Sequence, residues 1–170
     1  SIVSLGYHRM GASLLQDIGR QRPDLLPEIV VVDINVRTHA SIREQGVRVI
    51  YGDAGSPEAL RHAGVEGAQL VISTLSDELL RGTSNAAIID AVRQVSKDAK
   101  IFACAARTRD VEKLYAAGAS YVFVPSAETA SGVFSAGVAA LEGKLDHYRS
   151  TRDAMHGPLT ATFDVDGLAS

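Results

Sequence analysis

The sequence predicts an α/β fold, a doubly wound parallel sheet of six strands followed by a C-terminal helix and a tail. Short β-branched runs alternate six times with helix-length amphipathic segments. Such alternation builds a parallel sheet with helices on both faces. Several of the runs are almost wholly apolar, as expected for strands that are buried on both faces.

The expected strands are residues 2–5, 29–33, 47–51, 70–73, 100–103 and 121–124. Apolar residues at spacings of three and four predict helices between them. The three clearest helix faces are Met10, Leu14, Leu15 and Ile18; Leu80, Ile88, Val92 and Val95; and Val111, Leu114 and Tyr115. Gly46, Gly64 and Gly118 follow helical segments, where a left-handed cap favours glycine. Ser56 and Pro57 form an N-cap followed by proline at the first helical position.

Length and composition favour one domain. The chain has 170 residues, of which 46% are hydrophobic and 22% charged, and its net charge is −3. A chain of this size buries a substantial core. No dense Lys/Arg block is present, so we do not expect a nucleic-acid partner. The single cysteine, Cys104, cannot form an internal disulfide and fits a reducing cytosol. No apolar run approaches the roughly 18 residues of a membrane span.

A glycine-containing turn follows the first expected strand and opens the first helix. It runs from Gly6 through Tyr7, His8, Arg9 and Met10 to Gly11. The Rossmann dinucleotide fingerprint, Gly-x-Gly-x-x-Gly, stands in this setting and presents a helix N-terminus to phosphate. His8 replaces the middle glycine, whose absence of a side chain lets pyrophosphate approach the backbone. A strand-to-helix turn without a ligand explains this motif equally well.

Asp33 ends the second strand, 22 positions after Gly11, and is followed by Ile34. An acidic residue at this place accepts hydrogen bonds from ribose hydroxyls. No arginine follows directly, which favours NAD-type or AMP-type ligands over NADP. The alternative is an aspartate that caps the next helix.

Polar residues also follow the third and fourth strands. Asp53 and Ala54 follow the third, where Gly-Asp is also common turn chemistry. Thr74 and Leu75 follow the fourth, beside the switch point of the sheet. Thr74 and Ser76 are candidate phosphate donors or, alternatively, caps of a helix beginning near Glu78.

Arg9 is the best-placed cation. Further candidates at this edge are Arg81, Arg107 and Arg109.

Motifs of catalysis are missing from the sequence. It contains no His-Glu-x-x-His, paired-cysteine, Gly-x-Ser-x-Gly or Tyr-x-x-x-Lys motif. Too few residues follow the sixth strand for a substrate domain. We therefore expect no enzyme, no catalytic residue and no metal site. Cys104 lies in a buried-looking strand, where inert packing is the default.

The order of five motifs resembles the RCK/KTN (TrkA-N-like) regulatory domain of bacterial potassium channels, uptake systems and Kef-type cation/proton antiporters. The motifs are Gly6–Gly11, Val32-Asp33, Tyr51-Gly-Asp-Ala54, Leu70-Val-Ile-Ser-Thr74 and Leu114-Tyr-Ala-Ala-Gly-Ala119. Residues 80–85 and the Ala-Ala-Gly-Ala run look most like the antiporter branch. The resemblance covers roughly residues 1–140, and its specificity comes from the order of motifs that are individually weak.

The resemblance implies a site for an adenine nucleotide, with AMP or NAD(H) favoured and ADP or ATP as options. Gly6, His8, Arg9 and Gly11 would line the phosphates, Asp33 the ribose, Asp53 the adenine and Thr74 the ribose-phosphate. Tyr7, Met10, Ile34, Ala54 and Leu75 are their neighbours in the expected site. His8 replaces a glycine, and Cys104 and Ala106 stand where many relatives carry an Arg-x-Arg pair. These departures favour a mononucleotide such as AMP, or no nucleotide.

The resemblance also implies a regulatory domain on the cytoplasmic face of the membrane that gates a membrane-embedded transporter domain. We expect a nucleotide-binding domain over residues 1–125, a dimerisation or crossover helix within 126–145, and a linker or tail over 146–170. A short strand at 160–165 is an option within that tail. Because the chain starts with Ser1 inside a strand, we expect it to be excised from a longer protein.

The expected crossover helix spans residues 127–145 and carries an apolar stripe. The stripe consists of Ala130, Val133, Phe134, Val138 and Leu141. An exposed apolar stripe usually marks an interface, which favours a homodimer or a higher ring. The alternative is a helix that folds back onto its own sheet. Two other functions stay open, the cofactor domain of an NAD-dependent dehydrogenase and a degenerate Rossmann module that only dimerises.

Overall fold

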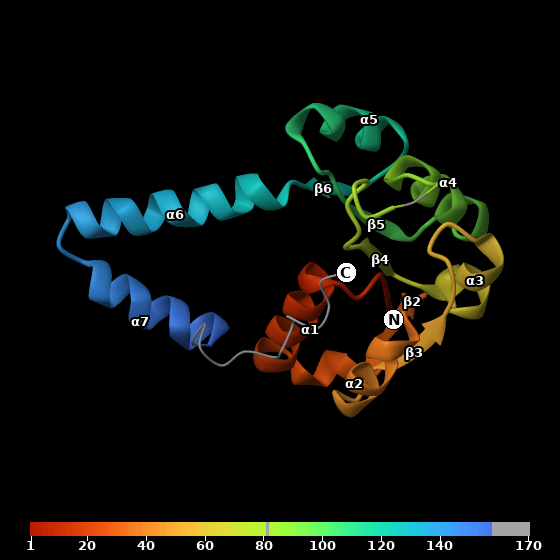
Figure 1. Cartoon of the computed structure of the whole chain (residues 1–170), viewed down its shortest axis with the longest axis horizontal. Coiled ribbons are helices and arrows are strands. Elements are labelled where there is room, and N and C mark those ends of the chain that lie inside the picture. The colour runs from red at the N-terminus through yellow and green to blue at the C-terminus, as the bar shows by residue number, and fades with distance from the viewer. Residues whose placement is uncertain (81, 158–170) are drawn as a thin grey trace.

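The structure, a computed structural model, describes residues 1–80 and 82–157 and contains a six-stranded, all-parallel sheet (Figure 1). Its strands are β1 (Ile2–Leu5), β2 (Ile29–Asp33), β3 (Arg48–Tyr51), β4 (Leu70–Ser73), β5 (Lys100–Cys104) and β6 (Tyr121–Phe123). They lie in the order β3-β2-β1-β4-β5-β6, so the first strand is central. The predicted fold class is confirmed, and each predicted strand boundary lies within one residue of the observed one.

Seven α-helices and four short 3₁₀ helices connect or follow the strands within the described residues. The α-helices are α1 (Arg9–Gln21), α2 (His39–Glu44), α3 (Pro57–His62), α4 (Asn85–Val95), α5 (Val111–Ala116), α6 (Pro125–Leu141) and α7 (Leu145–His156). The 3₁₀ helices are η1 (Pro23–Glu28), η2 (Val36–Thr38), η3 (Val65–Gly67) and η4 (Thr108–Asp110). No helix in the described part of the chain is long and apolar enough to cross a membrane.

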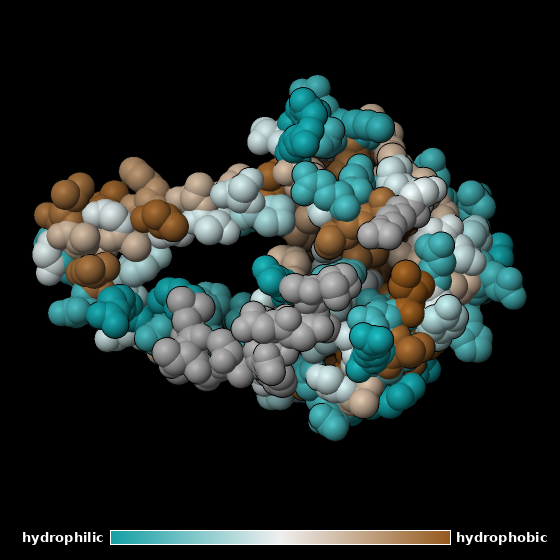
Figure 2. All heavy atoms as spheres, in the orientation of Figure 1, coloured by the Kyte–Doolittle hydropathy of each residue, from teal (hydrophilic) through white to brown (hydrophobic). Residues whose placement is uncertain are grey.

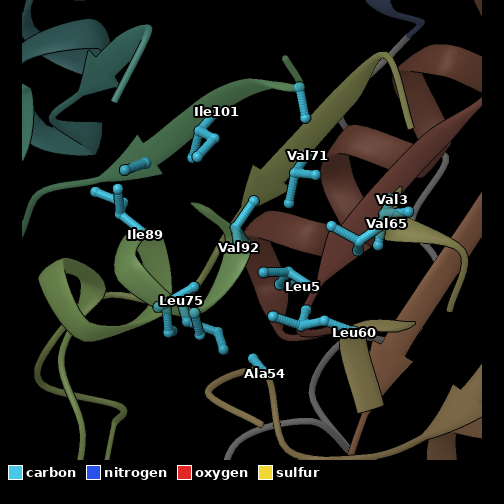
Figure 3. Close-up of a cluster of buried hydrophobic side chains, with 14 of the residues drawn as sticks. Val3, Leu5, Ala54, Leu60, Val65, Val71, Leu75, Ile89, Val92 and Ile101 are labelled. Carbon is cyan, nitrogen blue, oxygen red and sulfur yellow. The ribbon is translucent and has the colours of Figure 1, made fainter. Parts of the chain in front are cut away.

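The sheet separates two cores. The larger core packs one face of the strands against α3 and α4, with Leu60 and Val92 among its buried members (Figure 3). The smaller core packs the other face against α1 and α2 through Leu15 and Ile42. Along β2, Val30 and Val32 belong to the larger core and Val31 to the smaller. This alternation explains why the strand has no polar face.

The predicted helix caps are confirmed. Gly46, Gly64 and Gly118 have φ angles of 79°, 82° and 107°. This left-handed conformation is strained for residues that carry a Cβ atom. The Ser56 side chain accepts a hydrogen bond from the amide of Ala59 at the start of α3.

Each of the three predicted helix faces was wrong at one residue. The helix expected near Glu78 begins only at Asn85, with Ser84 as its N-cap, so Leu80 lies in the preceding loop. Its apolar side chain still packs against the larger core from there. Met10 and Tyr115, which were assigned to buried faces, are exposed because each lies at the margin of its helix stripe.

The C-terminal elements also differ from the prediction. The helix expected over 127–145 is α6, which begins two residues earlier and ends at Leu141. A turn at Glu142–Lys144 follows, with Gly143 at φ 70°. The polar segment expected to be a linker from residue 146 forms α7 as far as His156. The optional strand at 160–165 lies outside the described residues.

The two last helices form an arm. In Figure 1, α6 leads away from the sheet and α7 returns toward α1. No residue of α6 is buried. The helix therefore does not fold back onto its own sheet, and that alternative is wrong. The hydroxyl of Tyr148 in α7 donates to the carbonyl of Gly132 at 3.1 Å. At its far end α7 contacts α1, where Nδ1 of His156 lies 3.3 Å from Oδ2 of Asp17.

Candidate functional site

The carboxyl ends of β1, β2 and β4 bring three of the predicted motifs together. β1 pairs with β2 on one side and with β4 on the other, in parallel. The turn after β1, Asp33 at the end of β2 and Thr74 after β4 therefore lie side by side. In doubly wound sheets, this edge at the point where the strand order reverses is where ligands bind.

The two glycines of the turn are required by its geometry. Gly6 has a φ of 85°, and a Cβ atom added there would collide with the Leu75 side chain. A Cβ atom on Gly11 would lie 2.7 Å from the carbonyl oxygen of Gly6 and 3.1 Å from Oγ1 of Thr74. The first glycine thus permits the tight turn, and the second permits close packing of α1 against it.

A Gly11→Ala variant is expected to lose about 1–3 kcal/mol of unfolding free energy, the usual cost of overpacking. The added methyl group meets a main-chain carbonyl, which cannot move aside as a flexible side chain can. Gly19→Ala is the matched control in the same helix, because its Cβ atom would meet only Leu26 at 3.6 Å. That control should gain about 0.5–1 kcal/mol from helix propensity. Urea denaturation measures both, and equal stabilities would contradict the close-packing argument.

Asp33 joins the end of β2 to the turn. Its side chain is buried, and its Oδ2 atom accepts a hydrogen bond from the Tyr7 amide at 2.6 Å. Its Oδ1 atom accepts from the Asn35 amide, also at 2.6 Å. The cap of the following helix η2 is Asn35, whose side chain accepts from the Arg37 amide. Asp33 therefore shapes the turn before that helix but does not cap it.

His8 is the N-cap residue of α1. Its φ of −100° and ψ of −167° are extended values that any residue adopts. The main chain at this position therefore does not require glycine, and any advantage of glycine here concerns the space left for a ligand. The half-buried His8 side chain makes no capping hydrogen bond to α1. The first amides of α1 are therefore not capped by this side chain. Uncapped amides at the positive end of the helix dipole are what an anion site requires.

Three of the predicted site residues direct their side chains inward. Tyr7 is buried, and its hydroxyl accepts from Nε2 of Gln45 at 2.9 Å. The Thr74 hydroxyl donates to the carbonyls of Leu5 and Gly6 at 3.1 Å each, so its proton is already engaged. Leu75 packs beneath Gly6. The side chains of these three residues therefore make contacts within the protein and do not project from this edge.

Other predicted residues stay exposed at the same edge. Ile34 is 66% exposed, and Arg9, Met10 and Asp53 are exposed as well. The Oδ1 atom of Asp53 accepts from the Gly55 amide at 2.8 Å, which is the turn chemistry that its sequence position also suggested. The adjacent Ala54 is buried in the larger core.

The remaining cations and the cysteine are less central. Arg107 pairs with Glu78 at 3.8 Å, and Arg109 is exposed. Arg81 lies outside the described residues.

Burial raises the pKa of the Cys104 thiol to about 11, with a further contribution from the charge of Asp77. The thiol therefore stays protonated at neutral pH, as expected for inert packing. Among the described residues, no group of three or more His, Cys, Asp or Glu side chains could hold a metal ion.

Asn85 and its partners were missed by sequence reasoning. Asn85 is fully buried at the start of α4, and its amide nitrogen Nδ2 donates to the Leu75 carbonyl at 2.6 Å. Its main-chain amide donates to Oδ1 of Asp77 at 2.7 Å, and its Oδ1 atom accepts from Ser73 at 2.7 Å. This network fixes the loop after β4. The available signal was a Ser-Asn pair directly before the apolar run of α4.

His39 was also missed. It lies at the start of α2, is buried, and its Nε2 atom is 3.1 Å from the carbonyl oxygen of Asp33. No motif predicts this contact, because it joins a side chain at the start of α2 to the main-chain carbonyl at the end of β2.

Comparisons with known proteins give a consistent result. The family model described as "TrkA-N domain" matches residues 2–125. A curated relative, the glutathione-regulated potassium-efflux system protein KefC of Enterobacter sp. (strain 638), is 28% identical over 142 residues, which cover 84% of this chain and 21% of KefC. The chain thus spans about a fifth of the length of this relative.

Solved structures agree with the family match. The TrkA-N domain of the inner membrane protein ybaL from Escherichia coli has a TM-score of 0.65 and 26% identity, covering 79% of this chain and 93% of that domain. The GsuK channel bound to NAD has a TM-score of 0.59 and 27% identity, covering 71% of this chain and 20% of the channel chain. The GsuK structure bound to ADP has a TM-score of 0.60 and 27% identity, covering 72% of this chain and 30% of that one.

Proposed function

The chain belongs to the TrkA-N domain family, and on that premise we propose that it is a regulatory domain of a potassium or other monovalent cation transporter. It binds an adenine nucleotide on the cytoplasmic side of the membrane and passes its occupancy to a membrane-embedded domain of the same or a partner chain. The similarity to KefC and to the GsuK channel supports this role. The nucleotide acts as a regulatory ligand and is not turned over.

One observation carries the proposal. The Asp33 carboxylate lies 2.6 Å from the Tyr7 amide, so an acceptor for ribose hydroxyls stands directly beside the turn that leads into α1. The main chain of the turn from Gly6 to Gly11 and the side chains of His8 and Arg9 bind the phosphates. Asp33 binds the ribose. The remaining contacts come from Met10, Ile34, Asp53, Ala54, Thr74 and Leu75.

AMP and NAD(H) are the favoured ligands, with ADP and ATP as alternatives. Titration calorimetry of the 170-residue chain with AMP, ADP, ATP and NADH tests this directly. NADPH serves as the control, because the Asp33 carboxylate repels a 2′-phosphate. We expect at least one of the four to bind and NADPH to bind more weakly. If none binds at millimolar concentration, the nucleotide-sensing proposal is wrong.

His8→Gly is expected to raise the affinity for NADH relative to that for AMP. His8 stands at the position where the fingerprint has a glycine, which leaves room for pyrophosphate to approach the backbone, and AMP has no pyrophosphate. Since the φ and ψ of His8 are ordinary, the substitution does not relieve backbone strain. His62→Gly on the exposed end of α3 controls for an unspecific change. An unchanged ratio of AMP to NADH affinity would contradict the steric argument.

The exposed surface of α6 suggests how the chain assembles. Of its apolar stripe, Phe134 is 73% exposed and Leu141 is 91% exposed. α7 covers the opposite face, which carries Gly132 and the half-buried Ala136. The stripe therefore has no cover within the described chain, and apolar residues are visible along the arm (Figure 2). We assign it to a second copy of this chain, which forms a two-fold symmetric homodimer and is also compatible with a higher ring.

A further inference from the structure

We propose that His39 is a positioning residue for the ribose acceptor, so that it controls how strongly the site distinguishes a ribose from a 2′-deoxyribose. This inference rests on the proposed nucleotide site. The Nε2 atom of His39 lies 3.1 Å from the carbonyl oxygen of Asp33, in buried surroundings. A carbonyl oxygen only accepts, so Nε2 carries the hydrogen and donates it.

The contact closes a short ring of hydrogen bonds. The Asp33 carboxylate accepts from the Asn35 amide, and the hydroxyl of Thr38 donates to the Asn35 carbonyl at 2.8 Å. His39 follows Thr38 and reaches back to the residue where the turn began. The end of the turn is thereby tied to its start, with Asp33 held at both its carboxylate and its carbonyl.

This arrangement matters for the site because β2 ends at Asp33. The pairing of β2 with β1 ends at Val32, and its pairing with the edge strand β3 ends at Asp33, which pairs with Tyr51. His39 replaces the missing strand continuation with a side-chain donor. Without it, the main chain at Asp33 is held on one side only, and the carboxylate is less well aimed at a ribose hydroxyl.

His39 is only 6% exposed and lies at the start of a helix of six residues. Another residue at this position could stabilise so short a helix equally well. What His39 specifically provides is an N–H group within hydrogen-bond distance of the Asp33 carbonyl oxygen. Glutamine places an amide N–H at a similar distance from the backbone, whereas leucine fills similar space without a donor. The pair of substitutions therefore separates the hydrogen bond from the packing.

The experiment compares AMP with 2′-deoxy-AMP by calorimetry in the parent chain, His39→Leu and His39→Gln. In the parent, loss of the 2′-hydroxyl should weaken binding about tenfold, as expected for a hydrogen bond to a charged group. In His39→Leu this ratio should fall to about threefold or less, while His39→Gln should retain the parent ratio. A merely structural role would lower the affinity for both ligands equally and leave the ratio unchanged.

Thr38→Val is the matched control. It removes a partly buried hydrogen bond from the same turn, but the Asn35 carbonyl keeps the Thr38 amide as a donor. Its ligand ratio should stay at the parent value. If His39→Leu does not fold by circular dichroism, His39→Asn takes its place, because the shorter amide does not reach Asp33.

The outcomes separate the two proposals. A parent chain that binds none of AMP, ADP, ATP and NADH contradicts the proposed function. A parent chain that prefers AMP, with a ratio unchanged in the donor-free variant, leaves that function standing and overturns the role of His39.

Discussion

Asp33→Ala is expected to weaken the binding of AMP or NAD by about 1–3 kcal/mol, the cost of losing a hydrogen bond to a charged acceptor. The structure adds a second consequence. The same carboxylate accepts from the Tyr7 amide, so its removal also leaves a buried main-chain donor of the turn after β1 without its partner. The variant should therefore lose stability together with affinity. Calorimetry measures the affinity, and thermal unfolding measures the stability.

Two further variants make the result specific. Asp33→Asn keeps one acceptor oxygen without the charge, so its affinity should lie between those of the parent and the alanine variant. Asp98→Ala removes an exposed carboxylate before β5, at the opposite edge of the sheet, and should bind as the parent does. Unchanged affinity of a folded Asp33→Ala chain would remove Asp33 from the ligand site.

Phe134→Asp is expected to convert a dimer into a monomer. Burying an unpaired carboxylate in the proposed α6 interface costs at least about 3 kcal/mol. That cost raises the dissociation constant of the dimer by more than about a hundredfold. The fold should be unaffected, because Phe134 is exposed and lies outside both cores. Sedimentation velocity at micromolar concentration measures the change.

Ser135→Asp is the matched control on the same helix. Ser135 is exposed and lies about 100° around the helix from Phe134, away from the apolar stripe. We expect it to leave the dimer intact. A parent chain that sediments as a monomer would contradict the homodimer and with it a gating mechanism that depends on the angle between subunits.

The strands were predictable because burial on both faces leaves an apolar run with sharp ends. β2 shows this most clearly, since Val30 and Val31 face different cores. The start of α4 was not predictable in the same way. Residues 73–84 contain several Ser, Thr and Asp side chains, each of which is a reasonable helix cap. Only the three-dimensional network around Asn85 selects Ser84 as the cap.

The candidate site could be located but not oriented from the sequence. The fingerprint and the spacing to Asp33 identify the residues that meet at the edge of the sheet. They do not reveal that the Thr74 hydroxyl is engaged by the carbonyls of Leu5 and Gly6. Nor do they reveal His39, since a contact between a side chain and a distant carbonyl follows no periodic pattern. α7 was missed because its polar composition resembles that of a linker.

Helix α1 has a mechanical consequence for the arm. Its first residues follow the turn at His8, and its second half carries Asp17 and Arg20, which contact His156 at the end of α7. Thirteen residues of α-helix form a stiff rod about 20 Å long. Used as a lever pivoted at its N-terminus, such a rod converts a tilt of about 6° into a displacement of about 2 Å at its far end, a shift of the size that moves helices at subunit interfaces. If the proposed nucleotide binds at the start of α1, a small adjustment around its phosphate would be enlarged where α1 meets the arm.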